Sequence, residues 1–344
     1  MLLDIRLLQF LLFLGFCQAY ATRCHRFCNC EETNTINCTN VGDEGLQILK
    51  ALTSYDYINL NYLFINGGRF GDLPNSNIFG LHVLRSLHTI RFVNTGITSF
   101  GPETFSGVPN LNYLSLDGNP LRSVQSHSMK YMSDLKSLSL NRIFDADRQN
   151  NAAVLKSIFD SPLPRLQNVS LHGNEIRFDI TETICKLPRL LHADLSNNRL
   201  ESFSLPPICI APIEELYLHD NDLTELPGLS NVPLKSLTLH GNPLNCDWDV
   251  CDQEKTLSLL VNTTSAYCAF PAKQRQRSVA ELMAEQTCSS SSVIRNILIG
   301  LGIMLMAVVL SIWWNGCCSR VNYYNKESYD MVRLSEETTD PTFV

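Results

Sequence analysis

One repeated pattern constrains the fold of this chain more than any other feature. The pattern L-x-x-L-x-L-x-x-N-x-L occurs at residues 111–121, 166–176, 190–200, 213–223 and 234–244. Degraded copies begin at Leu60, Leu87 and Leu135, and the eight starts are 27, 24, 24, 31, 24, 23 and 21 residues apart. A unit of this length holds one short strand and a return segment, and it cannot bury its apolar edge alone. The sequence therefore predicts that the units stack on one another.

Stacking of the units defines the predicted fold class. Strands of successive units form a parallel sheet, and the leucines of the pattern point inward into one continuous core. We expect an α/β leucine-rich repeat solenoid, with a curved parallel sheet of about eight repeats over residues 60–244. The asparagine of each unit is expected to satisfy backbone groups where the strand turns, so these residues are interpreted as structural: Asn119, Asn174, Asn198, Asn221 and Asn242.

The two ends of the chain predict secretion and membrane anchoring. Residues 1–21 resemble a signal peptide, because an apolar stretch precedes Ala19-Tyr20-Ala21, a pattern that signal peptidase accepts. The alternative, an uncleaved anchor, is disfavoured because the stretch is too short to cross a bilayer. A second apolar run predicts a transmembrane helix at 293–314 rather than a buried helix. We therefore expect a single-pass type I protein of the plasma membrane, with residues 22–292 outside the cell and a tail at 315–344 inside.

The cysteines agree with this topology. Of 13 cysteines, ten lie in the predicted ectodomain, and an even number suits disulfides formed in an oxidising compartment. Eight of them flank the repeats and predict an N-terminal cap at 22–59 and a C-terminal cap at 245–288: Cys24, Cys28, Cys30, Cys38, Cys246, Cys251, Cys268 and Cys288. Zinc binding is the competing interpretation of the N-terminal cluster.

The other five cysteines lie outside the caps. Cys185 and Cys209 hold equivalent positions in consecutive repeats, about 5 Å apart if the repeats stack. They form either a disulfide or a pair of buried thiols. Cys317 and Cys318 directly follow the predicted span and are candidate palmitoylation sites; the alternative is two unmodified thiols. Cys17 leaves with the signal peptide.

Several functional classes are disfavoured. The chain has 27 basic and 34 acidic residues and a net charge of −7, so it is not a polybasic nucleic-acid binder. An open repeat sheet offers no cleft for a Ser-His-Asp or Cys-His pair, so we expect neither an enzyme nor a cofactor. His192, His219 and His240, with Asp194 and Glu215, fall on neighbouring rows of the sheet. We expect them to be hydrogen-bonding side chains rather than metal ligands.

Strand positions that flank the inward leucines predict the exposed face of the sheet, because strand side chains alternate. These positions are Tyr62, Phe64, Asn66, Thr89, Arg91, Val93, Tyr113, Ser115, Asp117, Asn168, Ser170, His172, His192, Asp194, Ser196, Glu215, Tyr217, His219, Ser236, Thr238 and His240. An aromatic ring such as Phe64 is costly on this face unless a partner or the N-terminal cap covers it.

Two segments resemble one family in particular. The long fourth unit carries Leu-Asn-x-Ile at 140–143 and then Arg148-Gln149-Asn150, and the C-terminal cap carries Cys268-Ala269-Phe270-Pro271, continuing to Glu281-Leu282. Both segments resemble the trophoblast glycoprotein family, also called Wnt-activated inhibitory factors. The resemblance implies a cell-surface glycoprotein that dampens Wnt/β-catenin signalling by acting on the Wnt co-receptor. An adhesion or guidance receptor is the alternative function.

The resemblance also implies cap pairings and site residues. The pairings are Cys24–Cys30, Cys28–Cys38, Cys246–Cys268 and Cys251–Cys288, although the C-terminal cap departs from the usual C-x-C spacing. The family has a phenylalanine implicated in Wnt inhibition at the position of Phe64, and a tyrosine at that of Phe270. Its implicated lysine is replaced by Asn37, so that charge is absent. We predict that an extracellular protein ligand contacts Phe64, Phe270, Tyr62, Arg91 and Tyr113.

Short motifs complete the expectations. Asn37, Asn168 and Asn262 begin glycosylation sequons. Asn168 falls on the exposed face of the sheet, so a glycan there would shift partner contact toward the N-terminal rows. The last residues, Thr342, Phe343 and Val344, resemble a ligand of an intracellular PDZ domain.

Overall fold

The computed structural model describes residues 24–30, 34–144, 150–229, 232–248, 254–260, 266–285 and 298–315. It divides into two compact units, Met1–Gln286 and Thr287–Val344, which are described separately. Several predicted features lie outside the described residues: the signal peptide at 1–21, Cys251, Asn262, Cys288, Cys317, Cys318 and the PDZ motif at 342–344.

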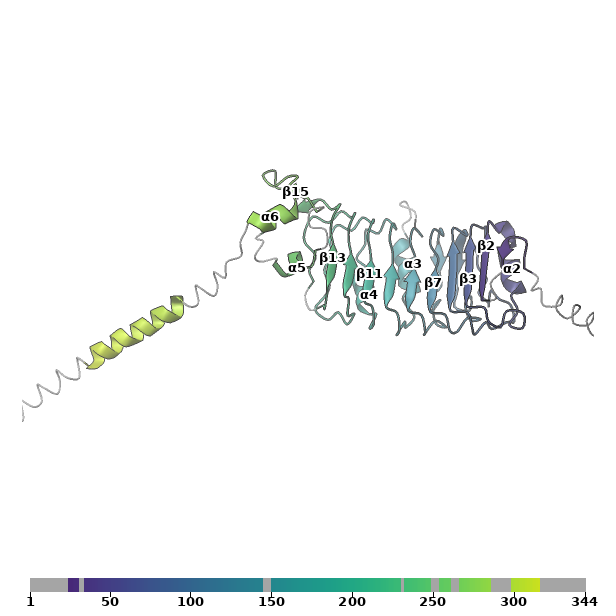
Figure 1. The fold of residues 1–344 in the computed structure, drawn as a ribbon, viewed down its shortest axis with the longest axis horizontal. Helices are drawn as coiled ribbons and strands as arrows, with labels where there is room; N and C mark the ends of the chain where they lie inside the picture. The colour runs from purple at the N-terminus through teal and green to yellow at the C-terminus, as the bar shows by residue number, and fades with distance from the viewer. Residues whose placement is uncertain are drawn as a thin grey trace, which may run out of the picture. The chain divides into compact units, whose positions relative to one another are not determined.

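The first unit is built on a ten-stranded sheet (Figure 1) with the order β1-β2-β3-β5-β7-β9-β10-β11-β12-β13. The bounds are β1 Cys28–Asn29, β2 Thr35–Thr39, β3 Tyr62–Asn66, β5 Thr89–Val93, β7 Tyr113–Ser115, β9 Ser137–Ser139, β10 Asn168–Ser170, β11 His192–Asp194, β12 Glu215–Tyr217 and β13 Ser236–Thr238. Its eight strands β3, β5, β7, β9, β10, β11, β12 and β13 come one from each predicted repeat. All pairs are parallel except β1–β2. The predicted leucine-rich repeat fold is confirmed.

Each repeat, with its strand and its return segment, forms one coil of the solenoid. The strand register aligns the pattern residues of successive coils. One buried row crosses the sheet through Leu63, Ile90, Leu114, Leu138, Val169, Ala193, Leu216 and Leu237. Each side chain in the row is covered by the coils on both sides. The core is therefore continuous from coil to coil, as stacking of the units requires.

The predicted structural role of the pattern asparagines is confirmed. The Asn198 amide donates to the carbonyls of Leu171 and Leu195, 3.0 and 2.9 Å away. Its Oδ1 accepts the backbone N–H groups of Asn174 and Ile176 in the preceding coil. All five asparagines are buried and bond to backbone in the same manner. None of them is available to a ligand.

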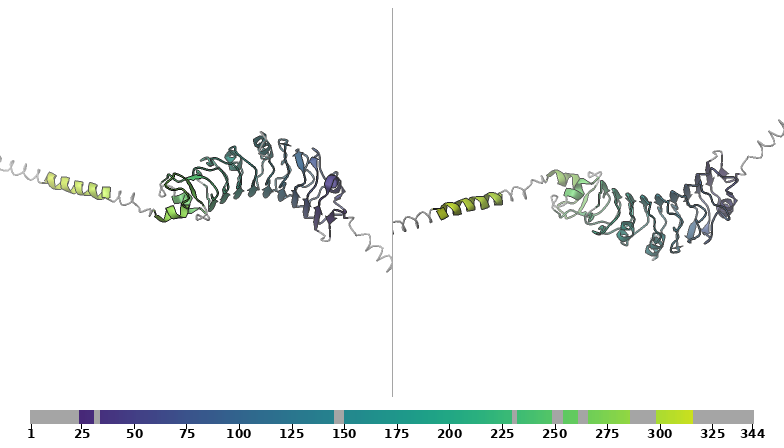
Figure 2. Two further views of the ribbon diagram at one scale, coloured as in Figure 1. Left: turned by 90° about the horizontal axis from the view of Figure 1, so that it is seen from above. Right: turned by 90° about the horizontal axis from the view of Figure 1, so that it is seen from below.

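The return segments form the other side of each coil. In the N-terminal half they contain a three-stranded sheet of β4 Gly71–Asp72, β6 Ile97–Phe100 and β8 Ser123–Val124. The later return segments contain the helices α3 Asn151–Ile158 and α4 Thr181–Cys185, and the N-terminal cap contains the short 3-10 helix η1 Gly42–Glu44 and the helix α2 Gly45–Ala51. Helix α3 accommodates the extra length of the fourth unit. Figure 2 shows the repeat stack curved, with the ten-stranded sheet on the inner, concave side.

The N-terminal cap continues the sheet instead of only closing its end. Strand β2 pairs with β3, and β1 pairs with β2. Disulfides join Cys24 to Cys30 and Cys28 to Cys38, the two pairings that the family resemblance implies. Tetrahedral zinc ligation by this cluster is thereby ruled out in this structure, since all four sulfurs are bonded.

The C-terminal cap has its own small apolar cluster, which includes Leu244, Leu257, Val279 and Leu282. Its elements are β14 Leu244–Asn245, β15 Cys268–Phe270, α5 Glu254–Ser258 and α6 Val279–Glu285. A disulfide joins Cys246 to Cys268.

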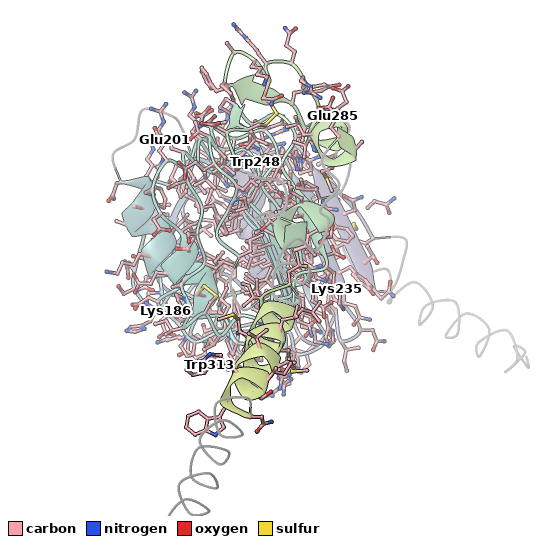
Figure 3. The ribbon with its side chains drawn as sticks, turned by 90° about the vertical axis from the view of Figure 1, so that its left-hand side faces the viewer. Lys186, Glu201, Lys235, Trp248, Glu285 and Trp313 are labelled. Atoms are coloured by element: carbon pink, nitrogen blue, oxygen red, sulfur yellow. A yellow bond between two sulfur atoms is a disulfide. The ribbon has the colours of Figure 1, made fainter. Side chains whose placement is uncertain are left out.

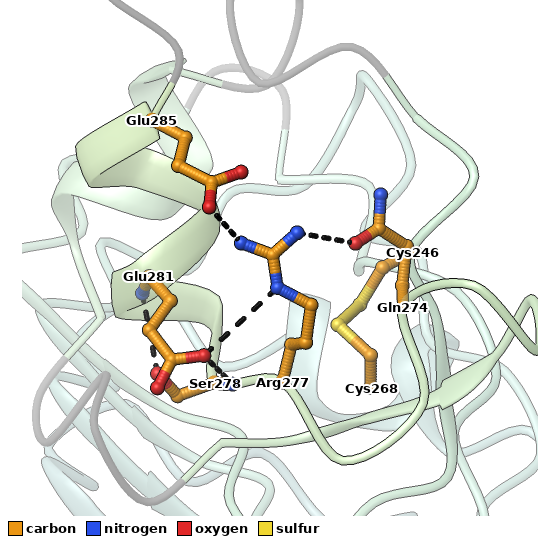
Figure 4. A network of polar contacts seen from close by, with 7 residues as sticks. All are labelled: Cys246, Cys268, Gln274, Arg277, Ser278, Glu281 and Glu285. Carbon is orange, nitrogen blue, oxygen red and sulfur yellow. Dashed lines mark hydrogen bonds and ion pairs between the residues drawn. A yellow bond between two sulfur atoms is a disulfide. The ribbon is translucent and has the colours of Figure 1, made fainter.

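A polar network lies beside that disulfide (Figure 4). Arg277 contacts the side chains of Glu285 and Glu281 and donates to Gln274 at 2.9 Å. The hydrogen bond to Arg277 lowers the pKa of Glu285. Arg277 thus fastens α6 to the loop that follows β15.

The open question about Cys185 and Cys209 is resolved in favour of a disulfide, with Cα atoms 4.7 Å apart. The bond links two consecutive coils through their return segments, at the end of α4.

The described part of the second unit is an apolar helix. It spans Leu298–Asn315, has a mean hydropathy of 2.0, and is long and apolar enough to cross a membrane. Trp313 projects outward from this helix (Figure 3) and is exposed, as is Trp314. Two indole rings at one end of a span are typical of a membrane–water interface.

Candidate protein-binding surface

The N-terminal end of the concave sheet carries a group of aromatic, basic and amide side chains. We define this N-terminal concave patch as Asn37, Tyr62, Phe64, Arg91 and Tyr113. The sheet register places Asn37 opposite Phe64 and Phe64 opposite Arg91. Tyr62 lies two residues before Phe64 on β3, and Tyr113 lies on β7, the strand next to that of Arg91.

Phe64 lies at the centre of this patch. Its ring centroid is 6.2 Å from that of Tyr62, and the Arg91 guanidinium lies over the ring, 6.0 Å from the centroid. A cation in this position is attracted by the quadrupole of the ring. Phe64 is partly exposed and Tyr62 is 42% exposed, so apolar ring surface remains open to solvent.

A shallow cavity of about 240 Å³ opens beside Phe64. It is lined by Asn37, Phe64, Ile65, Asn66, Arg91 and Val93. Its volume is below the roughly 300–1,000 Å³ of typical small-molecule sites. The space fits one inserted side chain or one sugar ring better than a cofactor.

Tyr113 borders the patch on the side away from the cap. Burial raises the pKa of its hydroxyl, while the nearby Arg91 charge acts in the opposite direction. Tyr113 therefore stays neutral near pH 7, and its hydroxyl hydrogen-bonds with the side chain of Ser139.

The alternative that the N-terminal cap covers Phe64 holds only in part. Strand β2 lies beside β3 in the sheet and makes Asn37 the register neighbour of Phe64, yet the Phe64 side chain stays partly exposed. The repeat pattern could not show this proximity, because β2 belongs to the cap and not to a repeat.

The structure does not bring Phe270 to this patch. Phe270 lies on β15 of the C-terminal cap and is 58% exposed. Between β3 and β13 there are seven strand spacings, or roughly 34 Å. A single small contact cannot include both Phe64 and Phe270, so they would serve separate contacts.

The C-terminal rows of the concave sheet carry a polar network. His192 Nδ1 lies 3.0 Å from Glu215, and the Tyr217 hydroxyl donates to the same carboxylate at 2.7 Å. The Tyr217 hydrogen bond, assisted by His192, lowers the pKa of Glu215.

His219 and His240 stack next to this network, with ring centroids 4.5 Å apart and planes inclined by 13°. Burial lowers the pKa of His219, and His240 lowers it further.

A metal site is the competing interpretation for these histidines. Candidate donor atoms of His219, Asp220 and His240 lie within 4.8 Å of one another. The two rings are nearly parallel, so the nitrogen lone pairs lie in parallel planes and do not converge on one ion. His219 Nδ1 also contacts the Thr238 hydroxyl at 2.8 Å. The geometry favours a hydrogen-bonding surface.

Three residues expected on the exposed face are buried there: Ser115, Ser196 and Thr238. Longer neighbours cover them through hydrogen bonds. The Ser115 hydroxyl donates to Asp117 at 2.8 Å and the Ser196 hydroxyl to Asp194 at 2.6 Å. The exposed face is therefore narrower than strand alternation alone predicts.

Both sequons within the described residues begin on the concave face. Asn37 is exposed on β2, and Asn168 is partly exposed on β10. Five strand spacings separate β2 from β10, or roughly 24 Å. Tyr62, Phe64, Arg91 and Tyr113 lie between them.

Comparison with known proteins agrees with the fold. Residues 85–142 match the leucine-rich repeat family. Trophoblast glycoprotein of Macaca fascicularis is 27% identical over 288 residues, covering 76% of this chain and 66% of the relative. The mouse protein is 27% identical over 296 residues, covering 76% and 67%. The chain thus spans about two thirds of the length of these curated relatives.

A solved structure is similar over nearly its whole length. The crystal structure of human trophoblast glycoprotein, or Wnt-activated inhibitory factor 1, superposes with a TM-score of 0.64 and 25% identity. The match covers 75% of this chain and 97% of the human one. The chain is a leucine-rich repeat protein homologous to trophoblast glycoprotein.

Proposed function

We propose that this chain is a non-enzymatic plasma-membrane glycoprotein that restrains Wnt/β-catenin signalling by binding a protein partner through the N-terminal concave patch. The observation that carries the proposal is Phe64, held on an open sheet face between Tyr62 and the Arg91 guanidinium, beside a cavity of about 240 Å³. The homologous human protein is named for Wnt-activated inhibition.

The chemistry of the patch supports binding to protein. Tyrosine, phenylalanine and arginine are enriched at interfaces, and residues that dominate the binding energy cluster where a pocket is desolvated. The cavity beside Phe64 accepts one side chain of a partner, and Arg91 offers several donors at its edge. The Wnt co-receptor is the partner class that we propose.

The apolar helix at 298–315 supports anchoring in a membrane. We propose a type I orientation, with the concave sheet outside the cell. Palmitoylation of Cys317 and Cys318 and binding of Thr342–Val344 to a PDZ domain stay predictions.

A Wnt reporter in stimulated cells tests the proposed function. Expression of the wild-type chain is expected to lower the reporter signal, and Phe64→Ala to restore it at equal surface level. Tyr131→Ala is the matched control, because Tyr131 is also an exposed aromatic residue under a cation, Lys130, but lies on a return segment. This control is expected to inhibit like the wild type.

The possible failures are distinct. A reporter that the wild-type chain leaves unchanged contradicts the proposed function. A reporter that Phe64→Ala lowers as fully as the wild type contradicts the site and leaves the function standing. Phe270→Ala in the same assay decides whether the C-terminal cap contributes a second contact.

A further inference from the structure

The Asn37 sequon lies within the N-terminal concave patch itself. Asn37-Cys38-Thr39 is the second half of β2, in which Asn37 and Thr39 are exposed and Cys38 is fully buried. Side chains of a strand stand roughly perpendicular to the sheet. Asn37 therefore presents its amide on the concave face, on the same side as Phe64.

Asn37 is the direct neighbour of Phe64. The two residues are register partners in the β2–β3 pair, where adjacent strands lie about 4.8 Å apart. Asn37 also forms part of the wall of the cavity beside Phe64, together with Arg91. A sugar attached to the Asn37 amide would begin at the edge of that cavity.

The chemistry of the cavity suits the first sugar of an N-linked glycan, N-acetylglucosamine. The apolar C–H face of this ring can pack on the open surface of Phe64, and its hydroxyl and acetamide oxygens can accept hydrogen bonds from Arg91. The small volume fits one ring rather than an extended ligand. Covering Phe64 would also remove an exposed aromatic surface from water.

We infer that a glycan on Asn37 occupies the cavity beside Phe64 and closes the N-terminal concave patch to protein partners. Chains that leave the secretory pathway without this glycan present the open patch, and chains that carry it do not. This regulatory consequence, the closing of the patch to protein partners, rests on the proposed function. The coverage of Phe64 by the sugar is independent of that function.

The second described sequon provides a matched control. Asn168 also lies on the concave sheet, but its register partners are Ser137 and His192, not a phenylalanine. At roughly 24 Å from β2, the first sugars of an Asn168 glycan lie over β9 to β11 rather than over Phe64.

Hydroxyl-radical footprinting of the full-length chain from secretory-pathway cells tests the inference. Trypsin releases Ala51–Arg69, which contains Phe64 and no sequon, so its oxidation is readable in every variant. Tyr55 on the same peptide is 87% exposed and is the internal reference. Oxidation of Phe64 relative to Tyr55 is expected to rise several-fold in Asn37→Gln and in Thr39→Ala, and not in Asn168→Gln.

Two variants separate the sugar from the amide. Thr39→Ala removes the sequon and keeps the Asn37 side chain, whereas Asn37→Gln removes both. If the sugar covers Phe64, the two substitutions must raise Phe64 oxidation alike. Glycopeptide mass spectrometry measures occupancy of Asn37 in the surface protein. An unoccupied Asn37, or equal Phe64 oxidation in all variants, overturns the inference.

The Wnt reporter distinguishes failure of this inference from failure of the proposed function. Asn37→Gln and Thr39→Ala are expected to inhibit more strongly than the wild type at equal surface level. Greater Phe64 oxidation with unchanged inhibition overturns the regulatory consequence alone. If neither the wild type nor the variants inhibit while Phe64 oxidation rises, the proposed function fails and coverage by the glycan stands.

Discussion

The Oδ1 atom of Asn119 lies 3.0 Å from the backbone nitrogen of Thr95, a residue of the preceding coil. The same oxygen accepts the Thr95 hydroxyl and the N–H of Ile97, while the Asn119 amide donates to the carbonyls of Phe92 and Leu116. All of this occurs at a fully buried site. One side chain therefore satisfies backbone groups of two successive coils.

We expect Asn119→Ala to lower the free energy of unfolding by at least about 3 kcal/mol, because each buried group left without a partner costs about 1–3 kcal/mol. Denaturant unfolding monitored by circular dichroism measures the change. Asn66→Ala removes an exposed asparagine of β3 and is expected to stay within about 0.5 kcal/mol of the wild type. We call the row of buried pattern asparagines, with their bonds to neighbouring coils, the asparagine ladder. Equal denaturation midpoints for the two variants would show that this ladder contributes little to stability.

The Cys185–Cys209 bond is expected to stabilise the middle of the array. The cysteines are 24 residues apart, and loop-closure entropy gives a loss of about 3.5 kcal/mol for Cys185→Ala with Cys209→Ala. The double variant is compared with the wild type in the same unfolding experiment. Alkylation of both cysteines in the unreduced wild-type protein would contradict the bond.

The His219–His240 pair is expected to make the C-terminal repeats sensitive to acid. Burial and the neighbouring His240 lower the pKa of His219, so the folded chain takes up a proton less readily than the unfolded one. The resulting stability is present above the ordinary pKa of about 6.5 and is lost as the pH falls through the lowered folded-state value. His240→Ala should raise the pKa of His219, measured by NMR titration, and Tyr131→Ala should not move it.

The N-terminus of α6 carries a reciprocal capping arrangement. The Ser278 hydroxyl accepts the N–H of Glu281 at 3.2 Å, and the Glu281 carboxylate accepts the N–H of Ser278 at 3.4 Å. We expect Ser278→Ala to lower the free energy of local unfolding of α6 by about 1 kcal/mol. Hydrogen exchange of the α6 amides measures it, with the β11 amides as the reference. Unchanged exchange in α6 would show that the disulfide and Arg277 alone hold the helix.

The repeat period predicts the parts of the fold that depend on local pattern. Three features follow from a unit that must stack to bury its apolar edge. They are the order of the eight repeat strands in the concave sheet, the buried row from Leu63 to Leu237 and the bonding of Asn198 to backbone. Each of these features repeats, so several copies of the pattern support the same inference.

Features that occur once could not be predicted in this way. Nothing in the cap sequence around Asn37 indicates that β2 joins the repeat sheet, because that pairing depends on where the cap folds back. The small sheet of β4, β6 and β8 depends on contacts between return segments, which the pattern does not specify. Burial of Ser115 likewise depends on the reach of Asp117 above it.

The asparagine ladder has a direction. Asn198 accepts the backbone N–H groups of Asn174 and Ile176 in the preceding coil, and Asn221 accepts that of Leu200 in the coil before its own. A ribosome makes the chain from the N-terminus, so each coil acquires the partner for its backbone only after the following coil has been synthesised. Folding of the nascent array should therefore trail synthesis by one coil, with the newest coil always incomplete until its successor arrives.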